Sequence, residues 1–292
     1  MTKRSAPQRS TAWWLSTLRR RRERQDDEQL DLSRPIEWTS ERERMAAIAF
    51  FNAAFRAEES GLRQAHELAA WVEAWDPDLA EVLRLYGDEE GWHRELLTEF
   101  LAYIGGSVRP MGRVTRTFYR LYGRARRMET IVLTNLMFET IGSTTYRMAL
   151  RNVRHPAARQ MLGILTRDES FHVPLNVHFL RRILERRSRV ERLRLTVLYR
   201  LLFVSLVLLP LASRPKAMAF DGISRRDLAR GYARMLAGLF EREPDLGLRA
   251  PGLVLRVLGI RRSELDDAEL AQTSIEAAER AADRTRVSVA AL

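Results

Sequence analysis

Four long segments of the chain carry apolar residues at the spacing of one face of an α-helix. In residues 41–75 the steps between successive stripe positions are 4, 3, 4, 3, 4 and 3, the period of a helix that buries one side. This stripe consists of Phe51, Phe55, Glu58, Leu62, Ala65, Ala69 and Val72. The other three segments are residues 78–103, 128–152 and 157–185. The pattern predicts an all-α protein with four long helices.

The connections between these segments predict how the helices pair. Pro77 separates the first two segments and Pro156 the last two, so each pair is expected to form a hairpin. A longer connection, residues 105–127, joins the two hairpins. One long crossover is typical of a ferritin-like four-helix bundle, which we expect over residues 41–187.

Segments of different character flank the predicted bundle. Residues 1–40 are charged and interrupted by proline, so we expect a mobile basic tail there. Residues 188–292 predict a C-terminal helical extension. Its expected helices are residues 190–213, 224–241 and 263–284, with a short apolar piece at 252–260.

Composition narrows the chemistry that the chain can perform. Apolar residues make up 46% of 292 residues, enough for a large core, and only 15 Gly and 10 Pro interrupt the helices. The absence of cysteine excludes disulfides, thiolate zinc sites, iron–sulfur clusters and cysteine nucleophiles. This usage is compatible with a reducing cytoplasm, where we place the protein.

The net charge of +11 does not by itself predict a nucleic-acid partner. The basic residues are spread along the chain, and no zinc finger, helix-turn-helix or RNA-binding aromatic motif accompanies them, so no specific nucleic acid is expected.

The most apolar run is too short to predict a membrane span. Residues 201–212 fall short of the roughly 20 residues that a spanning helix needs, and extending the run backwards takes in Arg200 and Arg194. Packing over the bundle is one interpretation, and a helix on a membrane surface with arginine anchors is the other. Cosedimentation with anionic liposomes tests the second, and absence of binding would contradict it. No secretory signal is expected, because no apolar region follows the basic residues near the N-terminus.

Two short motifs combine a carboxylate and an imidazole. Glu90-x-x-His93 lies in the second predicted helix and Glu169-x-x-His172 in the fourth. A spacing of three residues places both side chains on one helix face. One such pair can be an exposed surface pair, but two in equivalent helices, from only five histidines, point to a shared site.

The other two helices each offer a carboxylate where an apolar residue is expected. Glu58 precedes Glu90 by 32 residues and Glu139 precedes Glu169 by 30, which places both members of each hairpin at the same height. Glu59 is the alternative to Glu58, although its helix face carries other charged side chains. Buried carboxylates are costly unless they are paired or bind a metal.

The combined set predicts a site for two divalent cations. Four glutamates carry a charge of −4, which two divalent metals balance when both histidines are neutral. Oxygen and nitrogen ligands without thiolate suit iron, with a Mn/Fe pair as the alternative. Small residues near the ligands leave room, and apolar or aromatic residues are candidates for the pocket wall. The small residues are Ala54, Gly61, Ala65 and Gly142, and the wall candidates are Phe51, Phe55, Leu62, Trp92, Leu136, Tyr146 and Phe171.

The order Glu, Glu-x-x-His, Glu, Glu-x-x-His over residues 45–185 resembles the ferritin-like di-iron carboxylate superfamily. This superfamily includes soluble fatty-acyl desaturases, bacterial multicomponent monooxygenases, aldehyde-deformylating oxygenases and rubrerythrins. The resemblance implies two metal sites with some bridging glutamates. One site would comprise Glu58, Glu90 and His93, and the other Glu139, Glu169 and His172.

Residues next to the ligands extend the resemblance. In monooxygenase-like members, the residue before each motif glutamate is often an Asp that bonds to a ligand histidine. Here these residues are Glu89 and Asp168, and we predict that Asp168 orients His93 and Glu89 orients His172. Soluble monooxygenases resembling this pattern carry a Thr one turn after the third carboxylate, and here Ser143 occupies that position. Ser143 is a catalytic candidate there, with a bond to its own helix backbone as the alternative.

The function expected from this resemblance is an O2-dependent di-iron oxidoreductase that acts on a hydrophobic small molecule or an acyl-type substrate. The sequence contains no electron-donor motif, so a separate ferredoxin or reductase is implied. The alternatives are a non-enzymatic iron-binding or peroxide-scavenging protein and a di-metal hydrolase. A homodimer is compatible with the sequence.

Overall fold

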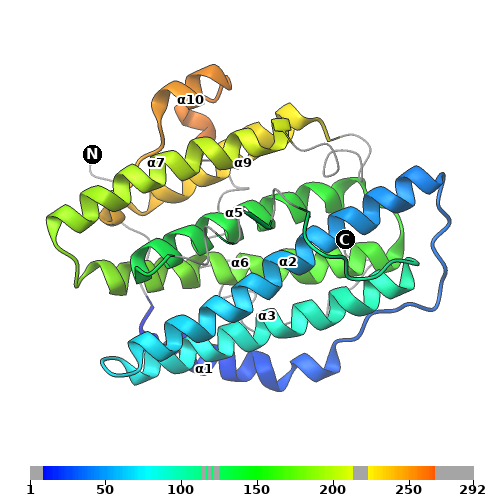
Figure 1. Ribbon diagram of the computed structural model, residues 1–292, viewed down its shortest axis with the longest axis horizontal. Helices are drawn as coiled ribbons and strands as arrows, with labels where there is room; N and C mark the ends of the chain where they lie inside the picture. Colours follow the sequence, from blue (N-terminus) through cyan, green and yellow to red (C-terminus); the bar gives the residue numbers. More distant parts are fainter. Residues whose placement is uncertain (1–8, 113–115, 118–119, 121–124, 213–222, 267–292) are drawn as a thin grey trace.

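The structure is a computed structural model whose regular structure is helical (Figure 1). It describes residues 9–112, 116–117, 120, 125–212 and 223–266. Within these ranges there are eight α-helices, three short 3-10 helices and no strand. The predicted all-α class is therefore confirmed.

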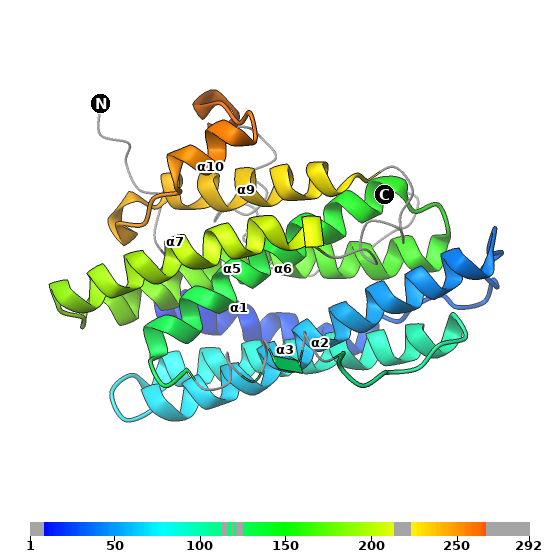
Figure 2. The same ribbon diagram turned by 45° about the horizontal axis from the view of Figure 1, so that its top comes forward.

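Two long helical hairpins form the centre of the molecule. Their helices are α2 (Glu41–Val72), α3 (Pro77–Tyr103), α5 (Met128–Asn152) and α6 (Pro156–Leu184), which match the predicted segments to within three residues at each end. Helix α2 packs along α3, and α5 packs along α6. Both views show α3 and α5 running in the same direction, so their connection passes from one end of the helices to the other (Figures 1 and 2).

The starts of the first hairpin's helices are encoded by local residues. Ser40 Oγ accepts a hydrogen bond of 3.2 Å from the backbone N–H of Glu43 and caps α2. Asp76 accepts a bond of 3.1 Å from the backbone N–H of Leu79, with Pro77 in the first turn of α3. These caps set where each helix begins and therefore the register of the ligands that it carries.

The predicted mobile N-terminal tail is wrong for its described part, residues 9–40. Helix α1 (Thr11–Glu23) packs along α3 and buries Trp14, Leu18 and Arg21. These positions follow one helix face, so the segment does possess an apolar stripe, which the surrounding charged residues conceal. The first eight residues lie outside the described part of the chain.

The predicted C-terminal extension forms a further helical layer on α5. Its helices are α7 (Arg189–Ala212), α9 (Arg225–Arg242) and the short α10 (Gly252–Val257). Helix α9 packs on α5, and α7 packs on α9. The predicted helix 263–284 overlaps a 3-10 turn at Arg262–Asp266, and its remainder lies outside the described residues.

Helix α7 has one buried face and one exposed apolar face. The ring of Tyr199 packs 4.6 Å from that of Phe240 in α9, whereas Leu193 and Leu201 are 66% and 63% exposed. By length and composition, residues 189–211 are also apolar enough to cross a membrane, although 33% of the most apolar window is buried in the protein. Contact with a membrane surface stays a prediction.

Candidate metal centre

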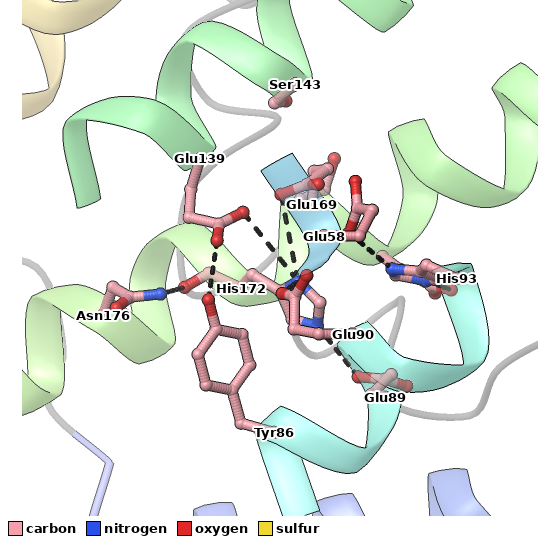
Figure 3. Close-up of polar contacts among 12 residues, drawn as sticks. Glu58, Tyr86, Glu89, Glu90, His93, Glu139, Ser143, Glu169, His172 and Asn176 are labelled. Carbon is pink, nitrogen blue, oxygen red and sulfur yellow. Dashed lines mark hydrogen bonds and ion pairs between the residues drawn. The ribbon is translucent and has the colours of Figure 1, made fainter. Parts of the chain in front are cut away.

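All six predicted ligands project into the space between α2, α3, α5 and α6 (Figure 3). Five of them are buried, and the side chain of Glu139 is 10% exposed. Each helix contributes at least one carboxylate, as the matched spacings in the two hairpins predict. The six residues are Glu58, Glu90, His93, Glu139, Glu169 and His172.

The ligand atoms form two overlapping groups that share one glutamate. One group is Glu58, Glu90 and His93, and the other is Glu90 with Glu139 and His172; within each group the atoms lie within 4.8 Å of one another. Glu90 is therefore the residue that would contribute to both groups if each held a cation. Glu169 belongs to neither group, but its Oε2 lies 3.8 Å from His172 Nδ1.

The two imidazoles are oriented in the same way. Nδ1 of His93 faces Glu58 Oε2 at 3.2 Å, and Nδ1 of His172 faces Glu90 Oε1 at 3.1 Å. Each Nε2 points outward and donates to an acid. His93 Nε2 lies 3.0 Å from Asp168 Oδ2, and His172 Nε2 lies 2.9 Å from Glu89 Oε2. Both predicted acid–histidine contacts are present.

A carboxylate behind each histidine determines which nitrogen is available to a metal. In the neutral imidazole, the outer Nε2 carries the proton of this hydrogen bond. The inner Nδ1 then has a free lone pair that can bind a metal. Such contacts also hold the ring in one orientation and increase its basicity as a ligand. Each histidine thus keeps its inner nitrogen among carboxylates, an arrangement that could hold a metal ion.

An arginine from α1 joins the two outer acids, and sequence reasoning missed it. Arg21 is fully buried, and its Nη2 lies 2.8 Å from both Glu89 Oε1 and Asp168 Oδ1. Its guanidinium carbon also lies 4.3 Å above the ring centre of Phe171. The spacing of Trp14 and Arg21 on one helix face was the signal that could have found it.

A second cation compensates Asp168 from its own helix. Arg167 Nε donates to Asp168 Oδ1 at 2.6 Å, and Arg167 Nη1 donates to Glu28 Oε1 at 2.9 Å. Burial disfavours the charged carboxylate, but Arg167 and Arg21 outweigh it and hold the pKa of Asp168 well below its usual range. The N-terminal segment thus supplies both Arg21 and Glu28 to the layer beneath the site.

Buried polar atoms inside the centre lack the hydrogen bonds that a metal-free site would need. Glu90 Oε1, Glu169 Oε2 and His172 Nδ1 are buried and make no hydrogen bond of good geometry, and their nearest polar contacts are one another, at 3.1 Å for Glu90 Oε1 and 3.8 Å for Glu169 Oε2 from His172 Nδ1. Buried polar atoms are almost always partnered in folded proteins. These three atoms belong to residues that face the same space, and their chemistry is that of ligands for a hard or borderline divalent cation. The residues present therefore fit a di-metal centre.

The crowding of carboxylates shifts their proton equilibria. Burial and the charges of Glu139 and Glu58 raise the pKa of Glu90 well above its usual range. Burial and Glu139 raise the pKa of Glu169 in the same way. Without cations, the centre therefore retains protons on carboxylates that metal ions would otherwise balance.

Hydrogen bonds to carboxylates also favour protonated histidine. Burial lowers the pKa of His93, but its bonds to Asp168 and Glu58 outweigh this effect and raise the pKa to about 9. A metal ion at Nδ1 would replace one of the two protons of this imidazolium.

Two buried tyrosines hold ligand carboxylates in place. Tyr86 Oη donates to Glu139 Oε1 at 2.6 Å, and Tyr146 Oη donates to Glu58 Oε1 at 3.1 Å. Burial, together with these carboxylates, raises the pKa of both tyrosines well above the usual range, so both hydroxyls stay protonated donors. Tyr146 was a predicted wall residue, whereas Tyr86 was not predicted.

Glycine makes room for the shared carboxylate. A Cβ at position 61 would lie 2.9 Å from Glu90 Oε2, closer than real side chains approach. At Gly142, a Cβ would meet Glu169 Oε1 at 3.9 Å, an ordinary contact. Of the small residues predicted to leave space, Gly61 is therefore the one on which the position of Glu90 depends.

A cavity of about 110 Å³ reaches the centre between α2 and α5. Its apolar wall differs from the prediction, because Phe50, Phe138 and Ile141 line it together with Tyr146. The other predicted wall residues do not line it: four of them are buried elsewhere in the core, and Leu62 and Trp92 are half-buried. Those residues are Phe51, Phe55, Leu62, Trp92, Leu136 and Phe171.

The structure does not bring Ser143 to the cavity (Figure 3). A residue four positions after Glu139 is rotated by about 40° around the helix, and here this turns the serine away from the ligands. Its hydroxyl instead accepts a hydrogen bond of 2.9 Å from Arg147 Nη2. The predicted catalytic position of Ser143 is corrected accordingly.

Comparison with known proteins adds no relative. The chain matches no protein-family model, no curated protein and no solved structure. The function must therefore be argued from the geometry of the centre.

Proposed function

We propose that the protein is a ferritin-like di-metal oxidoreductase that uses O2 to oxidise an organic substrate. The observation that carries this proposal is the pair of buried histidines, each with Nδ1 among glutamates and Nε2 on an outer acid. Two helical hairpins joined by a connection that spans their length support the ferritin-like assignment.

Iron is the metal that we propose, with a Mn/Fe pair as the alternative. Glu58, Glu90 and His93 would hold one ion, and Glu139 and His172 with the shared Glu90 would hold the other. Glu169 would complete the second site from 3.8 Å away. Carboxylate and imidazole donors without thiolate favour these metals over copper or structural zinc.

When bound, a metal pair would supply the electron-transfer chemistry that O2 activation needs, and the protein would supply position and a dry environment. Tyr86 and Tyr146 donate hydrogen bonds that hold Glu139 and Glu58. Phe50, Phe138 and Ile141 give the cavity an apolar wall, which supports a hydrophobic or acyl-type substrate. Reduction of O2 consumes electrons, so a separate ferredoxin or reductase would serve as the donor.

Metal content per chain tests the centre. We expect about two metals, mostly iron, after anaerobic loading with Fe(II), measured by inductively coupled plasma mass spectrometry. Glu90→Ala should lose both, and His172→Ala should keep roughly one. The control Glu59→Ala removes the neighbouring carboxylate, which is partly exposed and pairs with Arg56 outside the centre, and should bind metal as the natural chain does. A metal-free natural chain, or variants that retain both metals, would overturn the proposal.

Oxygen dependence then separates the proposed reaction from its alternatives. With reduced ferredoxin as donor, we expect O2 consumption that increases when an acyl-type substrate is added. A di-metal hydrolase would convert its substrate equally well without O2, and an iron-storage protein would take up far more iron than two ions per chain. Either result would replace the oxidoreductase proposal while leaving the metal centre in place.

A further inference from the structure

An arginine-rich basin lies on the surface of α2 and α3, beside the mouth of the metal cavity. Five arginines line it, with Glu59 as the one acidic residue in its wall. The basin has a volume of about 650 Å³. The arginines come from α2, α3 and the connection after α3, and they are Arg56, Arg63, Arg94, Arg116 and Arg120.

Only part of this positive charge is compensated by the protein. Arg56 pairs with Glu59 at 2.6 Å and also donates to the backbone carbonyl of Arg109. Among the described residues, Arg63, Arg94 and Arg120 have no ion pair or side-chain hydrogen bond. Clustered guanidinium groups repel one another, so such a wall favours an anion between them.

Ser60 connects the basin to the metal cavity. It lines both spaces, while its helix neighbours Ala57 and Gly61 line only the cavity. The hydroxyl of Ser60 is buried and makes no hydrogen bond. An unpaired buried hydroxyl at the junction of a cationic basin and an apolar cavity indicates a position where a ligand passes.

The volumes of the two spaces show how a substrate can divide between them. The cavity of about 110 Å³ is well below the range of roughly 300–1,000 Å³ that holds a complete small-molecule ligand. It accepts the reacting end of a chain and little more. The basin, at about 650 Å³, is much larger than the cavity of about 110 Å³, and it can hold the remaining part of the molecule.

We propose that the basin binds the anionic group of an amphipathic substrate, a carboxylate or phosphate monoester, whose apolar end enters the cavity past Ser60. Arg63 and Arg94 are the principal contacts, because neither has a protein partner among the described residues. This inference rests on the proposed function and specifies its substrate class. The basin selects the anion, and the aromatic wall at Phe50 and Phe138 selects the apolar end.

Calorimetric titration of the metal-loaded full chain tests this inference with three ten-carbon probes: decanoate, decyl phosphate and decan-1-ol. We expect decanoate or decyl phosphate to bind at least about tenfold more tightly than the alcohol, since a hydrogen bond between two charged groups is stronger than one to a neutral hydroxyl. The preference between the two anions tells which acid the basin takes. Inorganic phosphate at millimolar concentration should compete with the preferred anion.

Two variants show whether the arginines of the basin cause the preference. Arg63→Ala with Arg94→Ala should weaken binding of the anion at least about tenfold and leave the alcohol unchanged. The control Arg256→Ala removes one exposed charge from α10, on the opposite side of the molecule from α2 and α3 (Figure 1), and should bind as the natural chain does. Circular dichroism verifies the fold of each variant.

The outcomes separate this inference from the metal-centre proposal. Equal affinity for the anion and the alcohol, or unchanged anion affinity in the double variant, overturns the basin while the metal content stays near two. Binding of a single-stranded oligonucleotide with the same arginine dependence, without binding of either ten-carbon anion, also overturns it. Loss of metal from the natural chain would instead refute the proposed function.

Discussion

The two halves of the metal centre have the same motif but different surroundings. The His93 half consists of Glu58, His93 and the outer acid Asp168, and the His172 half consists of Glu139, Glu169, His172 and the outer acid Glu89. In the His93 half, the imidazole lies within hydrogen-bond distance of carboxylates on both sides, 3.2 and 3.0 Å. In the His172 half, Nδ1 is 3.8 and 3.9 Å from the carboxylates of its own half.

The outer acids of the two halves also differ in how many arginines balance their charge. Two arginines contact Asp168, whereas of these two only Arg21 contacts Glu89. The pKa of Glu58 is lowered, because hydrogen bonds and the charge of His93 outweigh the effect of burial, whereas burial and Glu139 raise the pKa of Glu169. The His93 half therefore has its ligands close together and must release only the extra imidazolium proton of His93, whereas the His172 half must release a proton from Glu169 and also draw its ligands together. We infer that the His93 half binds metal more tightly.

The largest expected effect comes from removing Arg21, which contacts the outer acids of both halves. Arg21→Ala leaves Glu89 and Asp168 without their common buried cation, which should lower the free energy of unfolding by roughly 3–5 kcal/mol. Urea unfolding followed by circular dichroism measures this loss. The control Arg19→Ala removes an exposed arginine from the same helix and should change stability by less than about 0.5 kcal/mol. Equal effects would show that the bridge contributes no stability.

The outer acids Asp168 and Glu89 should each control the metal affinity of their own half of the centre. Asp168→Asn keeps the shape of the side chain but removes the charge behind His93, and should weaken the tighter metal site by about 10–100-fold. Glu89→Gln makes the matching change behind His172 and should act on the weaker site only. Competitive titration of Fe(II) against a chelator measures both affinities. If either variant weakened both sites equally, the two halves would not be separate units.

Much of the centre could be predicted because its ligands lie at regular helical spacings. Glu90 and His93 are three residues apart on one helix face, and the gaps of 32 and 30 residues within the hairpins place both members of each hairpin at the same height. The outer acids were predictable for the same reason, since Glu89 and Asp168 each adjoin a ligand in the chain. Local periodicity was therefore enough to predict the long helices and the inner ligands.

The missed features depend on contacts that no spacing reveals. Arg21 reaches partners 68 and 147 positions away, and its helix was concealed by the basic run that surrounds it. Ser143 was misplaced because a resemblance gives the position in the chain but not the rotation around this particular helix. The fold class was thus predictable from the hydrophobic pattern, whereas the contacts of Arg21 with the outer acids could be seen only in the packed structure.

The smallest expected effect tests the position of the shared ligand Glu90 with two matched glycine variants. Gly61→Ala places a methyl group 2.9 Å from Glu90 Oε2, so this flexible carboxylate must move away from the position between the two halves. We expect metal affinity to fall by about tenfold, because a ligand displaced by a fraction of an ångström loses its geometry. Both metals should be affected, since Glu90 belongs to both groups.

Gly142→Ala is the matched change on α5, where the new methyl group meets Glu169 Oε1 at 3.9 Å and displaces nothing. Replacing a helical glycine with alanine should raise the free energy of unfolding by up to about 1 kcal/mol in Gly142→Ala, because alanine loses less backbone entropy. In Gly61→Ala the displacement of Glu90 should offset this gain, so the two variants differ in both stability and metal affinity, which urea unfolding and a chelator titration measure. If Gly61→Ala kept full affinity for both metals, Glu90 would not be the bridge, and the two halves would be joined only through Arg21.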